Sequence, residues 1–522
     1  MAEAGINTLI AAPERARPAA RWKIAAQAIG LLAAFMVLFS VIQLGTPALV
    51  GNDGYYHVKM GQLMRMEGLT PAFRWLPLSI LNEADYYDHH FLYHVYLALF
   101  IPGNPAAASP ADLTLAGKAA SVVMPSLAFL AIWWLLRGQG VRHAWLWALG
   151  LFAVSSAFLY RMSMPRAQSA SLLVLALAMH WMLKRRWLPL IGLGFVYVWL
   201  YNAFPLLLAA AGAYTLAVLL SERRLIWQPL AAAAAGVVLG LVINPYFPQN
   251  VSFIASHILP KLLATTAERV GREWYPYETW TLVENSGVAL GLFVLGAFGL
   301  GWRGQRMDRH TLFAFGMAVL FGVMVLRSRR FVEYFPAFAL IFAAFSLTPL
   351  LDDLEKRVTA RVTGRWSQAI VPAGLAAVIA LPLALGVIGA RDDVGDSKRA
   401  DLYAAAAGWL ADHAQPGALV FQTDWDDFPR LFFYNTASVY TIGLDVTYMS
   451  LYDADLFDEW VDISRGRVEE PGAVIADRFG ADYVFSDLDH GAFLEQAARD
   501  PLLREVYRDG DAVIFEVLEA GD

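Results

Sequence analysis

The stretch from Gly51 to His94 contains the side chains best suited to chemistry, including four of the chain's ten histidines. Asp53 comes shortly after the long apolar run Ile24–Leu44, where a carboxylate suits a general base or a metal ligand. As a base it has to reach a hydroxyl or amide proton of an acceptor. Asn52, Asp53 and Gly54 are also common turn residues, so the sequence equally allows a polar turn at a helix end.

A second group of acidic and imidazole side chains follows at Asp88, His89 and His90. His94 lies one helical turn after His90, so these two rings share one face of a helix. Carboxylates and imidazoles bind divalent metals, and Asp53, Asp88 and His90 are the candidate ligands for Mg²⁺ or Mn²⁺. For His89 and His90 individually, we favour the alternative that they are hydrated polar side chains on an interfacial helix. For Asp88 we predict a catalytic role.

Two arginine clusters supply the candidate groups for binding phosphate, because a guanidinium fork pairs with two phosphate oxygens. The candidates are Arg161, Arg166, Gln168, Arg329, Arg330 and Tyr334. The first cluster lies in a short loop without acids, and its alternative is ordinary snorkelling of arginine at a helix end. The second cluster has a structural pair with Glu333 as its alternative. We favour phosphate binding for both clusters.

Two further segments contain weaker candidates. Aromatic residues alternate with acids in Arg272–Trp280, which suits a sugar-binding surface or a membrane interface. Glu273, Glu278 and Glu284 could act there as bases or metal partners. The acidic turn Thr423–Pro429 follows a predicted strand and is either a site or a solvated loop. The weaker candidates that we retain are His57, His89, Glu278, Glu284, Trp425 and Asp426.

The elements that must position these residues are mainly membrane helices. The chain of 522 residues is 58% hydrophobic and 16% charged, which is typical of a polytopic α-helical membrane protein. Its net charge of -6 gives no indication of a nucleic-acid partner, and it has no cysteine. Apolar runs long enough to cross a bilayer occur near 24–44, 113–137, 143–160, 166–184, 187–203, 204–220, 226–246, 287–303, 310–326, 331–350 and 368–390.

These eleven predicted spans have a consistent orientation, because most short basic loops fall on one side. The N-terminus is expected in the cytoplasm, and residues 45–112 and 250–286 are expected to form long outer loops. An interfacial helix is predicted within 91–104. The arginines of 327–330 fall on the outer side, against the rule, which favours a chemical role. We divide the chain into a transmembrane domain, 1–390, and an extracytoplasmic α/β domain, 391–522, with predicted strands at 418–422, 438–442, 483–486 and 512–517.

Several short segments resemble those of the GT-C superfamily of membrane glycosyltransferases, in particular the catalytic subunit of oligosaccharyltransferase. Asn52–Tyr56 is similar to the acidic motif of the family's first outer loop, and this places Asp53 at its catalytic and metal-binding position. Arg330–Tyr334 resembles the Arg-Phe-x-Tyr-Tyr segment, whose arginine contacts the lipid-linked diphosphate. Trp409–Leu410 and Thr423–Asp427 resemble the Trp-Leu and Trp-Trp-Asp-Tyr-Gly segments of its soluble domain.

The chain also departs from the family pattern. The second outer loop of the family usually carries an acidic pair that completes the metal site, whereas this chain has Arg161, Arg166 and Gln168. Only Trp425 and Asp426 match the motif that reads the acceptor peptide. These changes weaken the expectation of a conventional metal site and of protein asparagine glycosylation.

The resemblance implies a glycosyltransferase in a bacterial inner membrane. It would move a sugar from a polyprenyl-phosphate or diphosphate donor to an unknown acceptor on the outer face. Asp53 would act as general base, helped by Asp88, and the arginines would hold the phosphate leaving group. One alternative is an oligosaccharyltransferase that acts on protein. Another is a non-catalytic membrane protein that binds lipid phosphate.

Overall fold

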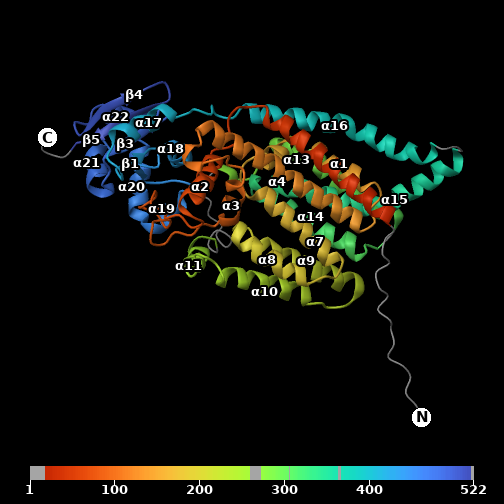
Figure 1. Cartoon of the computed structure of the whole chain (residues 1–522). Coiled ribbons are helices and arrows are strands. Elements are labelled where there is room, and N and C mark those ends of the chain that lie inside the picture. The colour runs from red at the N-terminus through yellow and green to blue at the C-terminus, as the bar shows by residue number, and fades with distance from the viewer. Residues whose placement is uncertain (1–17, 259–271, 305, 363–365, 519–522) are drawn as a thin grey trace, which may run out of the picture.

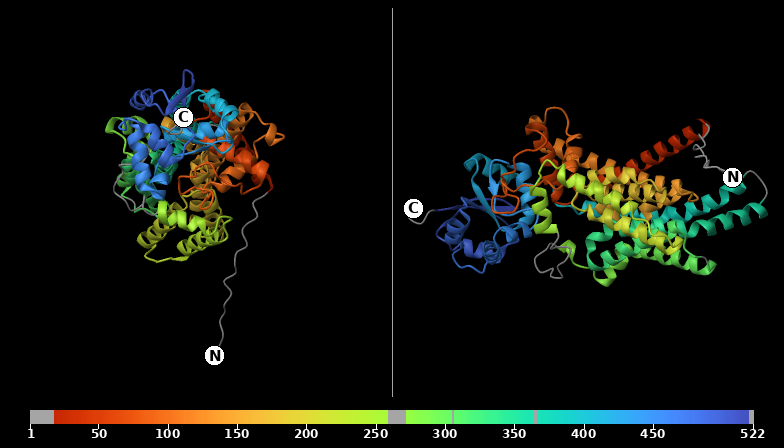
Figure 2. Two further views of the ribbon diagram at one scale, coloured as in Figure 1. Left: turned by 90° about the vertical axis from the view of Figure 1, so that its left-hand side faces the viewer. Right: turned by 90° about the horizontal axis from the view of Figure 1, so that it is seen from below.

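The structure is a computed structural model, and it describes residues 18–258, 272–304, 306–362 and 366–518. A long helical bundle carries a smaller sheet-containing part at one end (Figures 1 and 2). The helices of the bundle and of its connecting loops are α1 (Pro18–Gln43), α2 (Asp53–Glu67), α3 (Phe91–Ala98), α4 (Pro110–Gly138), α5 (Ala144–Gly150), α6 (Ser156–Met162), α7 (Gln168–Leu183), α8 (Leu188–Leu200), α9 (Pro205–Glu222), α10 (Gln228–Val242), α11 (Gln249–Phe253), α13 (Thr279–Arg303), α14 (Arg309–Arg327), α15 (Phe335–Arg361) and α16 (Ile370–Gly395).

Seven of these helices are long and apolar enough to cross a membrane, which confirms a polytopic membrane protein. Each of the eleven predicted spans coincides with a helical segment. Three of them, α7, α8 and α10, are shorter apolar helices. The run predicted as one span at 143–160 is broken instead, because α5 and α6 meet at a bend of 95°. Ser155 causes the restart, since its hydroxyl accepts a hydrogen bond from the Phe158 amide and caps α6.

The C-terminal part is an α/β structure with one five-stranded sheet. The strands are β1 (Leu419–Gln422), β2 (Val439–Tyr440), β3 (Tyr483–Asp487), β4 (Leu503–Arg508) and β5 (Ala512–Val517), in the order β2-β1-β3-β5-β4. β1 is parallel to β2 and β3, whereas β5 is antiparallel to β3 and β4. Four of the strands match the predicted ones. β4 was missed because its exposed residues are charged and do not alternate with buried apolar ones along Leu503–Arg508.

Helices cover this sheet and connect its strands. They are α17 (Ala404–His413), α18 (Phe428–Tyr434), α19 (Thr447–Tyr452), α20 (Ala454–Ser464), α21 (Pro471–Val474) and α22 (Gly491–Ala497). Three short turns of helix matter for the site: η4 (Arg272–Trp274), η5 (Arg329–Glu333) and η7 (Trp425–Asp427).

The first predicted outer loop packs against the sheet part. Buried aromatic side chains of 56–87 share one core with α18, including Tyr56, Phe73 and Phe432. Trp75 adds hydrogen bonds, since its indole donates to the carbonyl of Thr436 at 2.9 Å. These contacts fix α2, and therefore Asp53, relative to the C-terminal part. The boundary at residue 390 stays a prediction.

Candidate active site between the helical bundle and the sheet

A cavity of about 960 Å³ lies where the helical bundle meets the C-terminal part. Residues from many parts of the sequence line it, including the start of α2, the loop 160–166, η4, η5 and η7. Ten of the predicted site residues are in its wall, namely Asp53, His57, His89, His90, Arg161, Arg166, Arg330, Tyr334, Trp425 and Asp426. The fold therefore brings the acidic segment and both arginine clusters to one space.

Asp53 is positioned by the first turn of α2. Gly54 lies so close to Pro165 that a Cβ at position 54 would be 2.3 Å from the Cγ atom of that proline. This contact requires glycine and brings Asp53 beside Arg166, whose Nη2 is 3.1 Å from the Asp53 Oδ2. Both side chains remain about one-fifth exposed to the cavity. The start of a helix also favours a carboxylate, because its amide dipoles point toward it.

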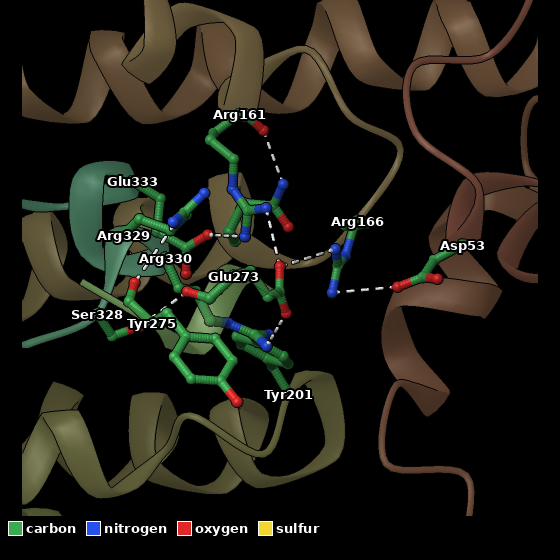
Figure 3. A network of polar contacts seen from close by, with 11 residues as sticks. Asp53, Arg161, Arg166, Tyr201, Glu273, Tyr275, Ser328, Arg329, Arg330 and Glu333 are labelled. Atoms are coloured by element: carbon green, nitrogen blue, oxygen red, sulfur yellow. Dashed lines mark hydrogen bonds and ion pairs between the residues drawn. The ribbon is translucent and has the colours of Figure 1, made fainter. Parts of the chain in front are cut away.

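The arginines converge on Glu273 of η4, a carboxylate that is not among the candidates retained from the sequence (Figure 3). Its carboxylate oxygens lie 2.5 Å from Arg330 Nη1, 3.0 Å from Arg161 Nη1 and 3.6 Å from Arg166 Nη1. Burial by itself raises the pKa of Glu273, but the three guanidinium groups outweigh it and hold the pKa well below its ordinary value. Glu273 is therefore ionised at any physiological pH.

Two further contacts complete this network. Arg161 Nη2 donates to the Glu333 Oε2 at 2.9 Å, and Glu333 is almost completely buried. Arg330 donates to the Tyr201 hydroxyl at 2.8 Å and lies over the Trp274 ring. Three arginines thus meet three carboxylates, those of Asp53, Glu273 and Glu333 (Figure 3).

Three of the predicted phosphate ligands have other partners. Gln168 donates to the backbone carbonyl of Arg161 at 2.7 Å and so orients that arginine. Arg329 bonds to the carbonyls of Tyr275 and Pro276 and lines a smaller neighbouring cavity. The Tyr334 hydroxyl donates to Ser171 at 2.8 Å. These residues support the arginine cluster from behind or beside it.

Asp88 lies behind the cavity wall and does not line it. Its Oδ2 is 2.7 Å from His94 Nδ1, and His94 Nε2 is 2.8 Å from His57 Nδ1. All three side chains are buried, and the Asp88 Oδ1 also accepts from the backbone amide of His90, which lines the cavity. These contacts favour a positioning role for Asp88 over direct participation, and its predicted catalytic role stays a prediction.

The three expected metal ligands do not form one site. Asp88 is bonded to His94 and to the backbone amide of His90, and Asp53 is paired with Arg166, so neither carboxylate is paired with the His90 ring. Burial lowers the pKa of His57 and His90 well below the ordinary value and that of His89 to about 4, so these rings are neutral. Among the described residues, no group of three or more acidic or imidazole side chains is placed to hold a metal. The residues present do not fit Mg²⁺ or Mn²⁺ in the predicted form.

The wall opposite the arginines is acidic and comes from the C-terminal part. Asn52 connects it to α2, because its amide donates to the Asp426 Oδ2 at 2.6 Å and its oxygen accepts from Arg430 Nε at 3.0 Å. Arg430 is fully buried, and its guanidinium lies 4.3 Å from the centre of the Tyr55 ring. Burial, together with the charge of Asp53, raises the pKa of Asp426 to about 7.

Glu278 and Glu284 lie outside the site. Both are exposed near the start of α13, and neither lines the cavity. The carboxylate of this loop that faces inward is Glu273. Residues 259–271 of the predicted loop lie outside the described residues.

No protein-family model matches the sequence, and no curated protein matches it either. Solved structures do match. Oligosaccharyltransferase AglB from Archaeoglobus fulgidus, in complex with an inhibitory peptide and a dolichol-phosphate, is 14% identical with a TM-score of 0.62, covering 92% of this chain and 72% of that one. ArnT from Cupriavidus metallidurans, bound to undecaprenyl phosphate, is 17% identical with a TM-score of 0.55, covering 96% and 99%. Arabinofuranosyltransferase AftD from Mycobacteria is 13% identical with a TM-score of 0.55, covering 95% and 41%.

These similarities establish the fold. The protein is an integral membrane protein with the GT-C fold of membrane glycosyltransferases, similar to the oligosaccharyltransferase form. One matching structure of an Archaeoglobus fulgidus oligosaccharyltransferase is a complex with Zn and sulfate. In this chain Asp53 has a cationic side chain beside it, because the Arg166 Nη2 lies 3.1 Å from its Oδ2.

Proposed function

We propose that the protein is a glycosyltransferase that takes a sugar from a polyprenyl-linked phosphate donor. The observation that carries this proposal is the meeting of Asp53 with Arg161, Arg166 and Arg330 in one cavity at the end of the helical bundle. The matching AglB and ArnT structures hold dolichol-phosphate and undecaprenyl phosphate, which supports the same donor chemistry here. The lipid tail would lie along the apolar helices of the bundle.

In the proposed reaction, the bond from the sugar's anomeric carbon to the phosphate oxygen breaks, and a bond to an acceptor oxygen forms. The electron pair of the broken bond goes to the phosphate oxygen, so the negative charge of the phosphate increases. The fixed guanidinium groups stabilise that charge as it develops. Asp53 takes the proton of the acceptor hydroxyl, and its pairing with Arg166 holds it in position.

The predicted orientation of the helices determines on which side of the membrane this reaction would take place. The N-terminus would lie in the cytoplasm, and the cavity and C-terminal part would lie outside the inner membrane of a bacterium. The basic loops between helices support this arrangement. Nucleic acid has no part in it.

Protein as the acceptor is a second candidate, supported by the position of Trp425 and Asp426 in the cavity wall. These two residues match part of the acceptor-reading motif. An oligosaccharyltransferase would transfer glycan to a peptide that contains Asn-x-Ser/Thr. A non-catalytic protein would bind the lipid phosphate and leave the sugar in place.

The test is sugar release from a labelled undecaprenyl phosphate sugar by the purified full chain, with the peptide and with membrane extract as acceptor sources. We expect Asp53→Asn to lower release about a thousandfold without loss of donor binding. Glu278→Gln, an exposed change on the same side of the bundle, serves as control and should leave release unchanged. Full activity of Asp53→Asn would overturn the assignment of the base. Binding without release in every acceptor mixture would favour the non-catalytic reading.

A further inference from the structure

The protein's own carboxylates are the close ionic partners of the arginine cluster. Arg161, Arg166 and Arg330 make these contacts with Asp53, Glu273 and Glu333, while the buried Arg161 Nε has no hydrogen-bond partner among the described residues. A phosphate that bonds to the guanidinium groups in place of a carboxylate must displace that carboxylate. Donor binding at the centre of this cluster therefore requires one carboxylate to leave.

Glu273 is the carboxylate placed to leave. Glu333 is only 2% exposed and is enclosed, and Asp53 is needed at the reacting end of the cavity. Glu273 is 27% exposed and contacts all three arginines, so its carboxylate already occupies the centre where a phosphate would be bound. Its position among the three guanidinium groups is visible in Figure 3.

The structure also provides a second position for the Glu273 side chain. Glu273 lines both the main cavity and the neighbouring one of about 370 Å³, whose wall contains Arg329. The backbone is fixed meanwhile, because the Ser328 hydroxyl donates to the Glu273 carbonyl at 3.0 Å and the Arg329 amide donates to the Tyr275 carbonyl at 2.9 Å. A rotation of the side chain is enough to exchange one anion for another.

We propose that Glu273 is an internal substitute for the donor's phosphate, and that the site is built for a donor with one phosphate group. This inference rests on the proposed function. A sugar phosphodiester carries one negative charge and replaces one carboxylate, so the cluster stays neutral. A sugar linked through a diphosphate carries two negative charges and would leave the cluster with one negative charge in excess. Acidic side chains already outnumber basic ones among the described residues of the cavity wall, so nothing there offsets the excess.

The same exchange would help the product to leave. After transfer, the phosphate is a monoester and carries one more negative charge than the donor did. The returning Glu273 carboxylate competes with this product for Arg161 and Arg330. Without that competition, the product would stay bound to the cluster.

The test is binding of two probes that share one tail and one sugar, undecaprenyl phosphate glucose and undecaprenyl diphosphate glucose. We expect the unaltered protein to bind the monophosphate at least about tenfold more tightly. Glu273→Gln should tighten both, by about tenfold for the monophosphate and by more for the diphosphate, because it removes the competing charge. It should also lower kcat and strengthen inhibition by undecaprenyl phosphate. Glu273→Asp, which keeps the charge, should resemble the unaltered protein.

Several outcomes would contradict this inference. A preference of the unaltered protein for the diphosphate would overturn the single-phosphate assignment, even if Glu273→Gln failed to fold. Weaker binding in a folded Glu273→Gln would show that Glu273 only braces the arginines. Loss of turnover with unchanged binding would make Glu273 a catalytic group instead. Failure of the unaltered protein to bind either probe, with Arg330→Ala indistinguishable from it, would overturn the proposed function itself.

Discussion

The two walls of the cavity hold charge in different ways. On the arginine wall, each guanidinium has a carboxylate partner, and Glu273 stays ionised because three cations surround it. On the opposite wall, Asp426 lies among other acids, and burial raises its pKa to about 7. The next residue, Asp427, does not line the cavity, and burial raises its pKa as well. The Asp427 Oδ2 has no hydrogen-bond partner among the described residues. The arginine wall is thus fixed in charge, whereas the charge of the acidic wall depends on pH.

This difference assigns the walls to different parts of the reaction. A leaving phosphate gains charge during transfer and needs a cationic surface that does not change with pH. An acceptor hydroxyl is neutral and needs hydrogen bonds and a base. Three predictions would break or sharpen this division.

The largest effect is expected on the arginine wall. Arg330→Lys keeps the positive charge but loses the forked contact with Glu273 and Tyr201. We expect kcat/KM for a polyprenyl phosphate sugar to fall about a hundredfold even at pH 6, where lysine as well as arginine is charged. The measurement is a pH series of initial rates with the purified protein.

Arg329→Lys is the matched control for that change. Arg329 is next in sequence but bonds to the loop carbonyls of Tyr275 and Pro276, outside the main cavity. Its effect should stay within a few-fold. Equal losses of activity at the two positions would mean that the total positive charge of the cluster matters and that the individual hydrogen bonds of Arg330 do not.

A smaller effect is expected behind the cavity wall, at Asp88. Asp88→Asn removes the charge that holds His94 and, through it, His57. Weakening this buried hydrogen bond destabilises the fold by about 1 to 3 kcal/mol, so the melting temperature should fall. Activity of the folded fraction should fall about tenfold, since Asp88 does not touch the cavity.

The losses of activity in Asp88→Asn and Asp53→Asn decide whether Asp88 has a positioning role. If Asp88→Asn costs as much activity as Asp53→Asn while the protein remains folded, Asp88 belongs to the chemistry and the positioning role is wrong. Circular dichroism on both variants separates unfolding from loss of function.

Residue types and spacing were enough to predict the helical segments of the bundle and four of the five strands. They could not predict which arginine faces the site. Arg329 and Arg330 lie in a 3₁₀ turn, in which successive side chains point about 120° apart, so neighbours in sequence have unrelated partners. Hydropathy also missed the break before α6, because a hydroxyl cap at Ser155 is a local hydrogen bond and not a change in apolar content.

Glu273 and Asp88 show a second limit of the sequence. The partners of Glu273 lie more than fifty residues away, in two different segments, so nothing near it marks it above Glu278 or Glu284. Asp88 looked equivalent to Asp53 because both are carboxylates of one loop. Only the packing of His94 and His57 over Asp88 separates their roles.

The smallest predicted effect is a pH dependence of stability that comes from Asp426. Its pKa of about 7 in the folded protein lies above the ordinary value of about 4 for an unfolded chain. Between those two values the folded protein binds more protons, so its unfolding free energy falls as pH rises, and above pH 7 the loss is complete. Asp426→Asn cannot ionise and can still accept the hydrogen bond from Asn52.

We therefore expect the unaltered protein to lose about 4 °C more than Asp426→Asn in melting temperature between pH 5 and pH 8. Asp412→Asn, the same substitution at an exposed position of α17, should follow the unaltered protein. Parallel curves for all three proteins would mean that Asp426 is ionised throughout. The acidic wall would then have a fixed charge like the arginine wall, and the division between the two walls would have to rest on hydrogen bonding alone.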